Sequence, residues 1–159
     1  MGMTMTPMSS VNVYFEQSAK ILHEALHTCF LKLGEEAKVK IRDRSAKESW
    51  IDQTGNLRSS IGYAIYNHGF ADVISAFEIV RNGSDGASAG RDYIEQLAHE
   101  YANSYALVII AGMNYASFVE AKDSKDVLAS TELWVRGVFK ERMERAVNAA
   151  IERINSLKL

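Results

Sequence analysis

The chain has 159 residues, a formal charge of −2 and a hydrophobic content of 47%, which suits one globular domain with a sizeable core. The nearly balanced charge gives no general reason to expect nucleic acid or an anionic membrane as a partner, and no apolar stretch approaches the ~20 residues that span a bilayer. A single cysteine, Cys29, excludes a disulfide within the chain.

The amino-terminal part of the chain predicts one long helix. Residues 1–10 are expected to form a disordered lead-in and residues 11–159 a single domain. Across residues 10–41, apolar residues recur at spacings of three and four, which indicates an amphipathic helix, and Gly34 is expected to loosen it. The apolar stripe consists of Phe15, Ala19, Leu22, Leu26, Cys29, Phe30, Leu33 and Ala37.

The middle of the chain predicts a small, mostly antiparallel sheet. A strand over residues 60–66 is followed by a turn at residues 67–69 and by a partner strand over residues 70–80. Residues 105–111 predict a third strand, which is so apolar that a central position in the sheet is expected. The side chains expected to point inward are Ile61, Tyr63 and Ile65 on the first strand and Val73, Phe77 and Ile79 on the second.

A loop and a short helix are expected between the second and third strands. Residues 81–90 contain three glycines, which predict a flexible loop. Residues 91–103 then predict a short amphipathic helix. Its apolar face is expected to contain Tyr93, Leu97 and Tyr101.

The carboxy-terminal part predicts a second long helix. Residues 115–121 predict one or two helical turns, and residues 126–129 a short strand. Ser130 or Thr131 is expected to cap a last helix that ends near Asn155. Its buried stripe is expected to contain Phe139, Met143, Ala146, Ala150, Ile154 and Leu157.

The order of these elements predicts the fold class. Two long amphipathic helices at the ends each need an apolar surface, and one face of the sheet can offer it. We therefore expect an α+β fold with long N- and C-terminal helices packed on a small, mostly antiparallel sheet, and with a short inserted helix.

One short motif has the spacing of a zinc site. The run H-E-A-L-H places His23 and His27 four residues apart on one side of a helix, where they can share a zinc ion while Glu24 activates a bound water. Helical geometry turns Glu24 away from the apolar stripe, so this site would face solvent or a partner. An exposed polar flank is the simpler interpretation, and a metal site is kept as an alternative. Candidates for the third ligand that it needs are Glu48, His68 and His99.

Other reactive residues give weaker signals. His99 and Glu100 are adjacent and point about 100° apart on a helix, so they do not form an acid–base pair readily. Cys29 lies in the apolar stripe and is expected to be buried and inert. The glycine run at residues 83–90 lacks the lysine of a phosphate-binding loop.

Two dense clusters carry charges of both signs. Such clusters are usually solvated, but they can also set the register between neighbouring subunits. They comprise Glu35, Glu36, Lys38, Lys40, Arg42, Asp43, Arg44, Lys47 and Glu48 in the first half, and Lys140, Glu141, Arg142, Glu144 and Arg145 in the last helix.

Two runs have the character of structural corners. They are D-Q-T-G-N-L-R-S-S-I-G-Y at residues 52–63 and G-M-N-Y-A-S-F-V-E at residues 112–120, and neither contains a nucleophile–base pair or a metal-ligand cluster. Gly55 allows a tight turn after a cap at Thr54. We expect the Arg58 guanidinium to pair with the Glu120 carboxylate and so to join the two runs.

These two runs resemble those of the neck and tail-component family of long-tailed, lambda-like phages, the gene-ten-product type. Members have a long amino-terminal helix, a T-G-N-L-R-x-S-I segment that enters a strand, and later a strand that ends in Gly before Tyr-Ala and Val-Glu pairs. This chain departs from the pattern before its Thr-Gly, after its Val-Glu, and by an insertion at residues 81–104. The resemblance is carried by Thr54, Gly55, Asn56, Leu57, Arg58, Ser60, Ile61, Gly112, Tyr115, Ala116, Val119 and Glu120.

The resemblance implies assembly and no catalysis. It indicates a phage or prophage structural protein at the head–tail junction (neck, connector or tail completion) that acts as a ring subunit. The implied partners are its own copies and phage portal, connector or tail-tube proteins, with DNA only as passing cargo and no membrane. The implied location is the virion, and the bacterial host cytoplasm during assembly. No catalytic residue, cofactor or metal is expected.

Two alternatives stay open. One is a small zinc metallohydrolase that uses His23, Glu24 and His27. The other is a host-derived binding module without a phage context.

Overall fold

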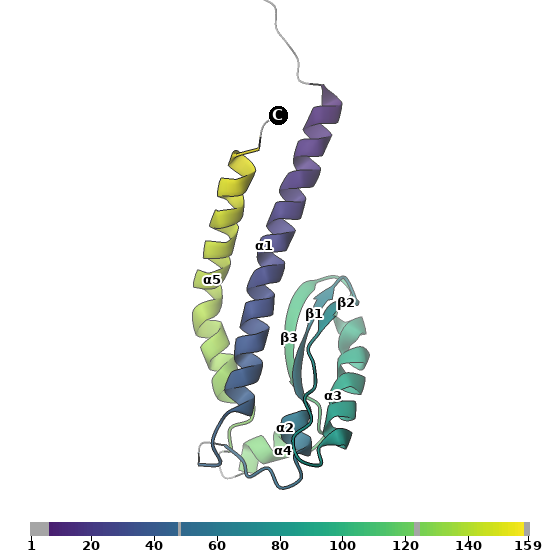
Figure 1. Cartoon of the computed structure of the whole chain (residues 1–159), viewed down its shortest axis with the longest axis vertical. Coiled ribbons are helices and arrows are strands. Elements are labelled where there is room, and N and C mark those ends of the chain that lie inside the picture. The colour runs from purple at the N-terminus through teal and green to yellow at the C-terminus, as the bar shows by residue number, and fades with distance from the viewer. Residues whose placement is uncertain (1–6, 48, 123–124, 158–159) are drawn as a thin grey trace, which may run out of the picture. The chain divides into compact units, whose positions relative to one another are not determined.

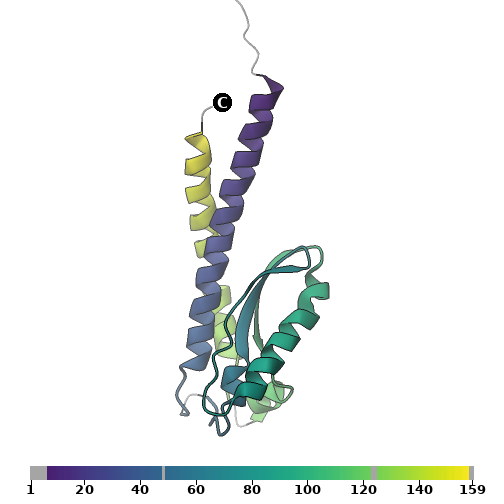
Figure 2. The ribbon, with the colours of Figure 1, turned by 45° about the vertical axis from the view of Figure 1, so that its right-hand side comes forward.

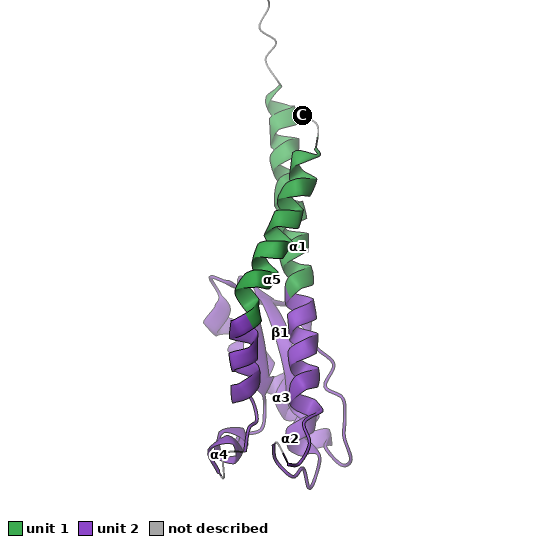
Figure 3. Ribbon diagram, turned by 90° about the vertical axis from the view of Figure 1, so that its left-hand side faces the viewer, with its two compact units in different colours: residues 1–29, 138–159 green, residues 30–137 purple. Residues whose placement is uncertain are grey.

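The computed structural model describes residues 7–47, 49–122 and 125–157. The chain divides into two compact units, which are described separately (Figure 3). Unit 1 comprises Met1–Cys29 and Val138–Leu159, and unit 2 comprises Phe30–Gly137. The elements are α1 (Met8–Arg42), α2 (Asn56–Ser59), β1 (Ile61–Asn67), β2 (Phe70–Ile74), α3 (Ser84–Leu97), the 3-10 helix η1 (Ala98–Tyr101), β3 (Tyr105–Ala111), α4 (Ala116–Ala121) and α5 (Ala129–Asn155) (Figure 1).

The expected fold class is confirmed. The chain is α+β, with long helices at both ends, a small antiparallel sheet and a short helix between its strands. The helical periodicity of residues 10–41 corresponds to α1, and the expected turns at residues 115–121 correspond to α4. None of the described helices combines the length and apolar character that a membrane crossing requires.

The sheet of unit 2 has the strand order β2-β1-β3, with both pairings antiparallel. The central strand is therefore β1, and the expectation that residues 105–111 are central is wrong. The β1–β3 pairing runs in register from Ile61 opposite Ala111 to Asn67 opposite Tyr105. The β1–β2 pairing contains a bulge, where the register shifts between Ile65 and Tyr66.

Both faces of this sheet are covered, although helices on one face were expected (Figure 2). Because side chains alternate along a strand, Ile61 of β1 joins a core cluster with Ile41 of α1 on one face. Ala64 of β1 joins a second cluster with Ile94 of α3 on the other face. Burial on both faces explains why β1 contains so few polar residues, whereas most of β2 is exposed.

Gly34 of α1 makes room for a neighbouring side chain. The helix continues through it from Met8 to Arg42. A Cβ atom at Gly34 would lie 2.6 Å from Cδ2 of Tyr63. The absence of a side chain therefore lets the Tyr63 ring lie directly against α1. Tyr63 is 2% exposed, and its hydroxyl donates a hydrogen bond to the Glu35 carboxylate at 2.9 Å.

The glycine run at residues 83–90 is not a flexible loop. It forms the first turns of α3, which begins at Ser84 and is followed by η1. Gly86 allows a close approach, because a Cβ atom there would lie 1.9 Å from the carbonyl oxygen of Asn56. On α3 the buried apolar residues include Ala87 and Ile94, whereas Tyr93, which was expected to be buried, is 42% exposed.

Two further strand expectations are corrected. The partner strand ends at Ile74, and the chain continues without strand pairing as far as Val80. Phe77 is buried as expected, but Ile79 is 59% exposed. Residues 126–129 contain no strand, because α5 already begins at Ala129.

Unit 1 is formed by the amino-terminal part of α1 and the carboxy-terminal part of α5. Helix α1 begins at Met8, inside the expected lead-in, of which residues 1–6 lie outside the described part of the chain. The predicted apolar stripe of α1 is buried from Cys29 onward, but Phe15 is 64% and Leu22 is 37% exposed. In α5, Ala150 is buried as expected and Phe139 is 40% exposed.

Candidate functional site

The first corner run forms the entry into β1. Gly55 has φ +88°, the left-handed region that favours glycine. Its N–H donates to Oδ1 of Asp52 at 3.0 Å, and the N–H of Asn56 donates to the Thr54 hydroxyl at 3.2 Å. The expectation that Thr54 caps this helix is wrong, because Gly55 holds the N-cap position of α2 and makes no side-chain cap.

The second corner run reaches the same core from β3. Gly112 follows β3, and its N–H donates to the carbonyl of Ser60 at 3.0 Å. Ala116 of α4 lies in one buried cluster with Leu57 and Ile61 of the first run. The two runs that carry the resemblance therefore meet in unit 2, in a single packed corner.

Tyr115, which precedes α4, also lies close to the first run. Burial raises the pKa of its hydroxyl, and the charge of Asp52 raises it further. Asn56 extends the corner to α3, because its side-chain oxygen accepts a hydrogen bond from the N–H of Gly86 at 3.2 Å. Val119 packs against the same buried cluster.

The expected ion pair between Arg58 and Glu120 does not form among the described residues. Arg58 lies instead 3.6 Å from a carboxylate oxygen of Asp52, donates to the carbonyl of Arg44, and covers the ring of Trp50 at 5.2 Å.

Glu120 caps the last helix. One of its carboxylate oxygens accepts hydrogen bonds from the N–H groups of Leu128 at 2.9 Å and Ala129 at 2.6 Å. A carboxylate oxygen of Asp126 accepts from the N–H of Ser130 at 3.1 Å. The start of α5 is thus capped by carboxylates, and the cap expected from the Ser130 or Thr131 hydroxyl is wrong.

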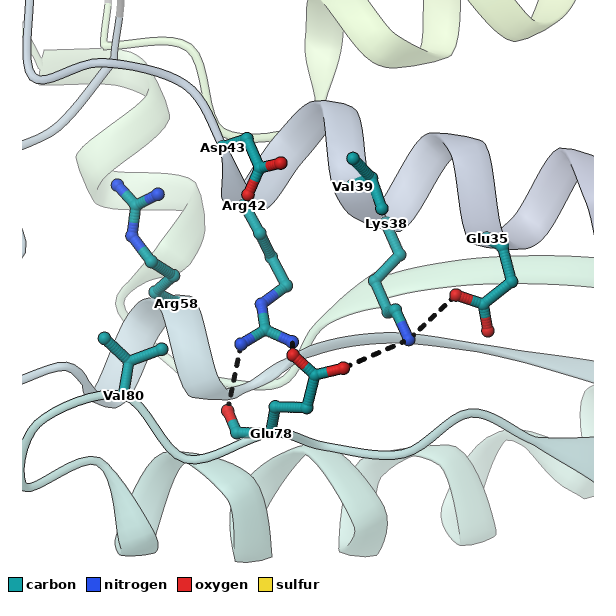
Figure 4. A pocket seen from close by; sticks show the side chains of 8 residues that line it. All are labelled: Glu35, Lys38, Val39, Arg42, Asp43, Arg58, Glu78 and Val80. Atoms are coloured by element: carbon teal, nitrogen blue, oxygen red, sulfur yellow. Dashed lines mark hydrogen bonds and ion pairs between the residues drawn. The ribbon is translucent and has the colours of Figure 1, made fainter.

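A cavity of about 440 Å³ lies beside the corner, between α1, α2 and the extended segment at residues 75–80 (Figure 4). Glu78 lies between two basic side chains of α1, 2.8 Å from Arg42 and 3.9 Å from Lys38. Lys38 also contacts Glu35 at 3.0 Å. The side chains of Lys38 and Arg42 are only 6% and 10% exposed, so this part of the charged cluster is not a solvated face.

This cavity is neutralised by its own residues. Burial raises the pKa of the Glu35 carboxyl, but hydrogen bonds from Lys38 and Tyr63 and the charge of Lys38 outweigh it, and the pKa lies below its usual value. Arg42 also donates to the backbone carbonyl of Glu78 at 3.1 Å. The arrangement fastens residues 75–80 to α1 and presents no nucleophile with a base beside it.

A second cavity, of about 360 Å³, lies at the start of α5. Arg44 pairs with a carboxylate oxygen of Asp126 at 2.6 Å and donates to the hydroxyl of Thr131. Lys40 lies 4.6 Å from the centre of the Trp134 ring, at cation–π distance. These contacts join the end of α1 and the loop after it to the start of α5 within unit 2. Sequence reasoning missed them because they connect residues far apart in the chain.

The zinc motif lies in unit 1. The rings of His23 and His27 stack with their centres 6.0 Å apart, which confirms that they share one side of α1. The Glu24 carboxylate lies 3.5 Å from the guanidinium of Arg153. Among the described residues of unit 1, no third histidine, cysteine or carboxylate completes a group of metal ligands with this pair.

The other residues that the sequence suggested as reactive do not form a catalytic or metal site among the described residues. His99 and Glu100 are both exposed on η1, and Cys29 is 9% exposed, as expected for a buried thiol. Of the candidate third zinc ligands, His68 lies in the turn between β1 and β2, while Glu48 lies outside the described residues.

Comparisons of the chain with protein families, with characterised proteins and with solved structures find no match.

Proposed function

We propose that the chain is a non-enzymatic phage or prophage structural protein that acts at the head–tail junction as a subunit of a ring. The observation that carries this proposal is the corner in which the two resembling runs meet. Its residues form caps, a glycine turn and a buried cluster, which is what a structural motif requires. The proposal therefore rests on the resemblance together with a role for these residues that agrees with it.

The charge balance of the chain agrees with a channel through which DNA passes without being held. The basic side chains beside the corner are engaged by carboxylates of the same unit, as with Arg42 and Glu78 or Arg44 and Asp126. In the proposed setting the ring contacts portal, connector or tail-tube proteins, and DNA passes through it as cargo. The net charge of −2 suits such a channel, since a strongly basic lining would retain the DNA.

A genetic experiment tests this function. The gene is deleted from the phage or prophage that encodes it, and the wild-type chain is supplied from a plasmid as the control. We expect electron microscopy of the deletion lysate to show DNA-filled heads and tails that are not joined, and complementation to restore joined particles. Complete and infectious particles from the deletion strain would contradict the proposal.

The zinc hydrolase is the second candidate, and one observation favours it: the rings of His23 and His27 lie side by side on one face of α1. Metal analysis of the purified chain tests it, with His27→Ala as the variant and Lys20→Ala, which removes an exposed side chain of the same helix, as the matched control. One zinc ion per chain that is lost only in His27→Ala, together with a hydrolytic activity lost in Glu24→Gln, would favour this candidate. Metal-free protein would remove it.

A further inference from the structure

Strand β3 forms one edge of the sheet in unit 2. The hydrogen bonds that bracket the β1–β3 pairing join even-numbered residues, Gly112 to Ser60 at one end and His68 to Ser104 at the other. In an antiparallel pair, alternate residues direct their N–H and C=O groups to the same side. The odd-numbered residues of β3 therefore direct these groups away from β1.

Leu107, Ile109 and Ala111 are three of these outward-directed residues. Within the described part of the chain, no further strand pairs with β3, and no other backbone group bonds to these three residues. A row of such groups on an apolar strand is a template for pairing with another chain. Edge strands of stable monomers usually carry a charge, a proline or a bulge that prevents this.

The β2 edge of the sheet has features that prevent pairing with another chain, and the β3 edge does not. The β2 edge is short and contains Asp72, and its pairing with β1 is bulged. In contrast, β3 has the sequence Y-A-L-V-I-I-A, and its pairing with β1 is regular. The chain has no charged residue from Tyr101 to Val119, so two β3 strands can approach each other without like charges opposite one another.

We propose that the outer edge of β3 pairs with β3 of a second copy in an antiparallel, two-fold contact centred on Ile109. In this register, Leu107 of each copy exchanges backbone hydrogen bonds with Ala111 of the other, and the two Ile109 residues exchange theirs. Val108 then lies opposite Ile110 of the second copy, and β-branched pairs of this kind stabilise sheets. The two sheets become one six-stranded sheet.

This inference does not rest on the proposed function, because it concerns the chain in solution. A two-fold contact closes after two copies, so the dimer is a form that covers the edge before any ring is built. The deletion experiment and the dimer experiment below can therefore fail independently.

Light scattering and amide hydrogen exchange on the full chain test the proposal. We expect a monomer–dimer equilibrium in which the amides of Leu107, Ile109 and Ala111 exchange at least about tenfold more slowly at high than at low protein concentration. The amides of Val108 and Ile110, which face β1, should be protected at every concentration. Exchange of the three outward amides that does not depend on concentration would overturn the proposal.

A pair of variants at Leu107 separates the backbone contact from the side chain. Leu107 is half-buried and belongs to neither core cluster. Leu107→Pro removes an N–H that points outward, which an edge strand tolerates, and it should abolish the dimer. Leu107→Ala keeps the N–H and should keep the dimer. A dimer that persists in folded Leu107→Pro would overturn the proposal, and if this variant does not fold, the exchange experiment on the wild type decides.

Discussion

Gly55 is the residue at which the corner is least tolerant of a side chain. A Cβ atom there would lie 1.9 Å from the carbonyl oxygen of Val80, and φ is +88°. We expect Gly55→Ala to lower the free energy of unfolding by about 2 kcal/mol, since the left-handed conformation alone costs ~1 kcal/mol. Gly137 of α5 is the comparison, because a Cβ atom there would have no other atom within 4 Å. Urea unfolding of Gly137→Ala should therefore show a gain of about 0.5–1 kcal/mol, and equal effects at both glycines would contradict this account.

Asp126 makes the stability of unit 2 depend on pH. Burial raises the pKa of its carboxyl, but hydrogen bonds from Ser130 and the charge of Arg44 outweigh this and lower it. A folded-state pKa below the unfolded value, which is about 4, stabilises the protein above that pH, and the stabilisation is lost as the pH falls through the folded-state pKa. We expect Asp126→Asn to cost about 1–2 kcal/mol near neutral pH, and the difference from wild type to shrink in acid.

The control for this prediction is Asp92→Asn. Asp92 is exposed on α3 and has no ion pair among the described residues. Urea unfolding across the acid range should show no comparable change for this variant. A difference between Asp126→Asn and wild type that stays constant as the pH falls would count against the Arg44–Asp126 pair as its cause.

At the scale of the elements, Glu120 connects α4 to the start of α5. Its carboxylate satisfies two N–H groups that a helix start leaves without an intrahelical partner. Glu120→Ala should lower the free energy of unfolding by about 1 kcal/mol, the typical effect of losing a cap. Glu141→Ala, which removes an exposed pair with Arg145, should change it by less than about 0.5 kcal/mol. Thermal unfolding followed by circular dichroism compares the two.

The elements that sequence reasoning predicted well are those whose signal is local. Helix α1 and strand β1 follow from periodic apolar spacing, and α4 lies where its turn was expected. The start of α3 was missed because glycine weakens a helix locally, whereas Gly86 is favoured here by the close approach of Asn56, which is distant in sequence. The edge position of β3 was also missed, because helices cover both sheet faces and make an edge strand as apolar as a central one.

Within the candidate site, residue types were predictable and partner choice was not. The two runs meet in one corner, which agrees with their interpretation as structural motifs. Arg58 and Glu120 nevertheless bind different partners, Asp52 and the first amides of α5. A run of sequence shows that a guanidinium and a carboxylate are present, but competition among several nearby partners is decided only by the packed structure.

For the whole molecule, the core is distributed unevenly between the two units. Among the described apolar residues, those that are buried in unit 1 are Cys29 and Ala150, and all the others lie in unit 2. Since buried apolar area is the main source of stability, unit 2 should dominate the free energy of unfolding. The part of the α1 apolar stripe that lies in unit 2 should therefore contribute more to the free energy of unfolding than the part in unit 1.

Leu22 and Leu33 give a matched test of this difference, because both are leucines of the α1 stripe. Leu33 is fully buried in unit 2, whereas Leu22 is 37% exposed in unit 1. We expect Leu33→Ala to lower the free energy of unfolding by about 3 kcal/mol and Leu22→Ala by less than about 1 kcal/mol. Urea unfolding measures both, and similar losses would show that unit 1 is as tightly packed as unit 2. If Leu22→Ala folds normally but fails to complement the gene deletion, the exposed part of the stripe serves a partner in assembly and not the stability of the chain.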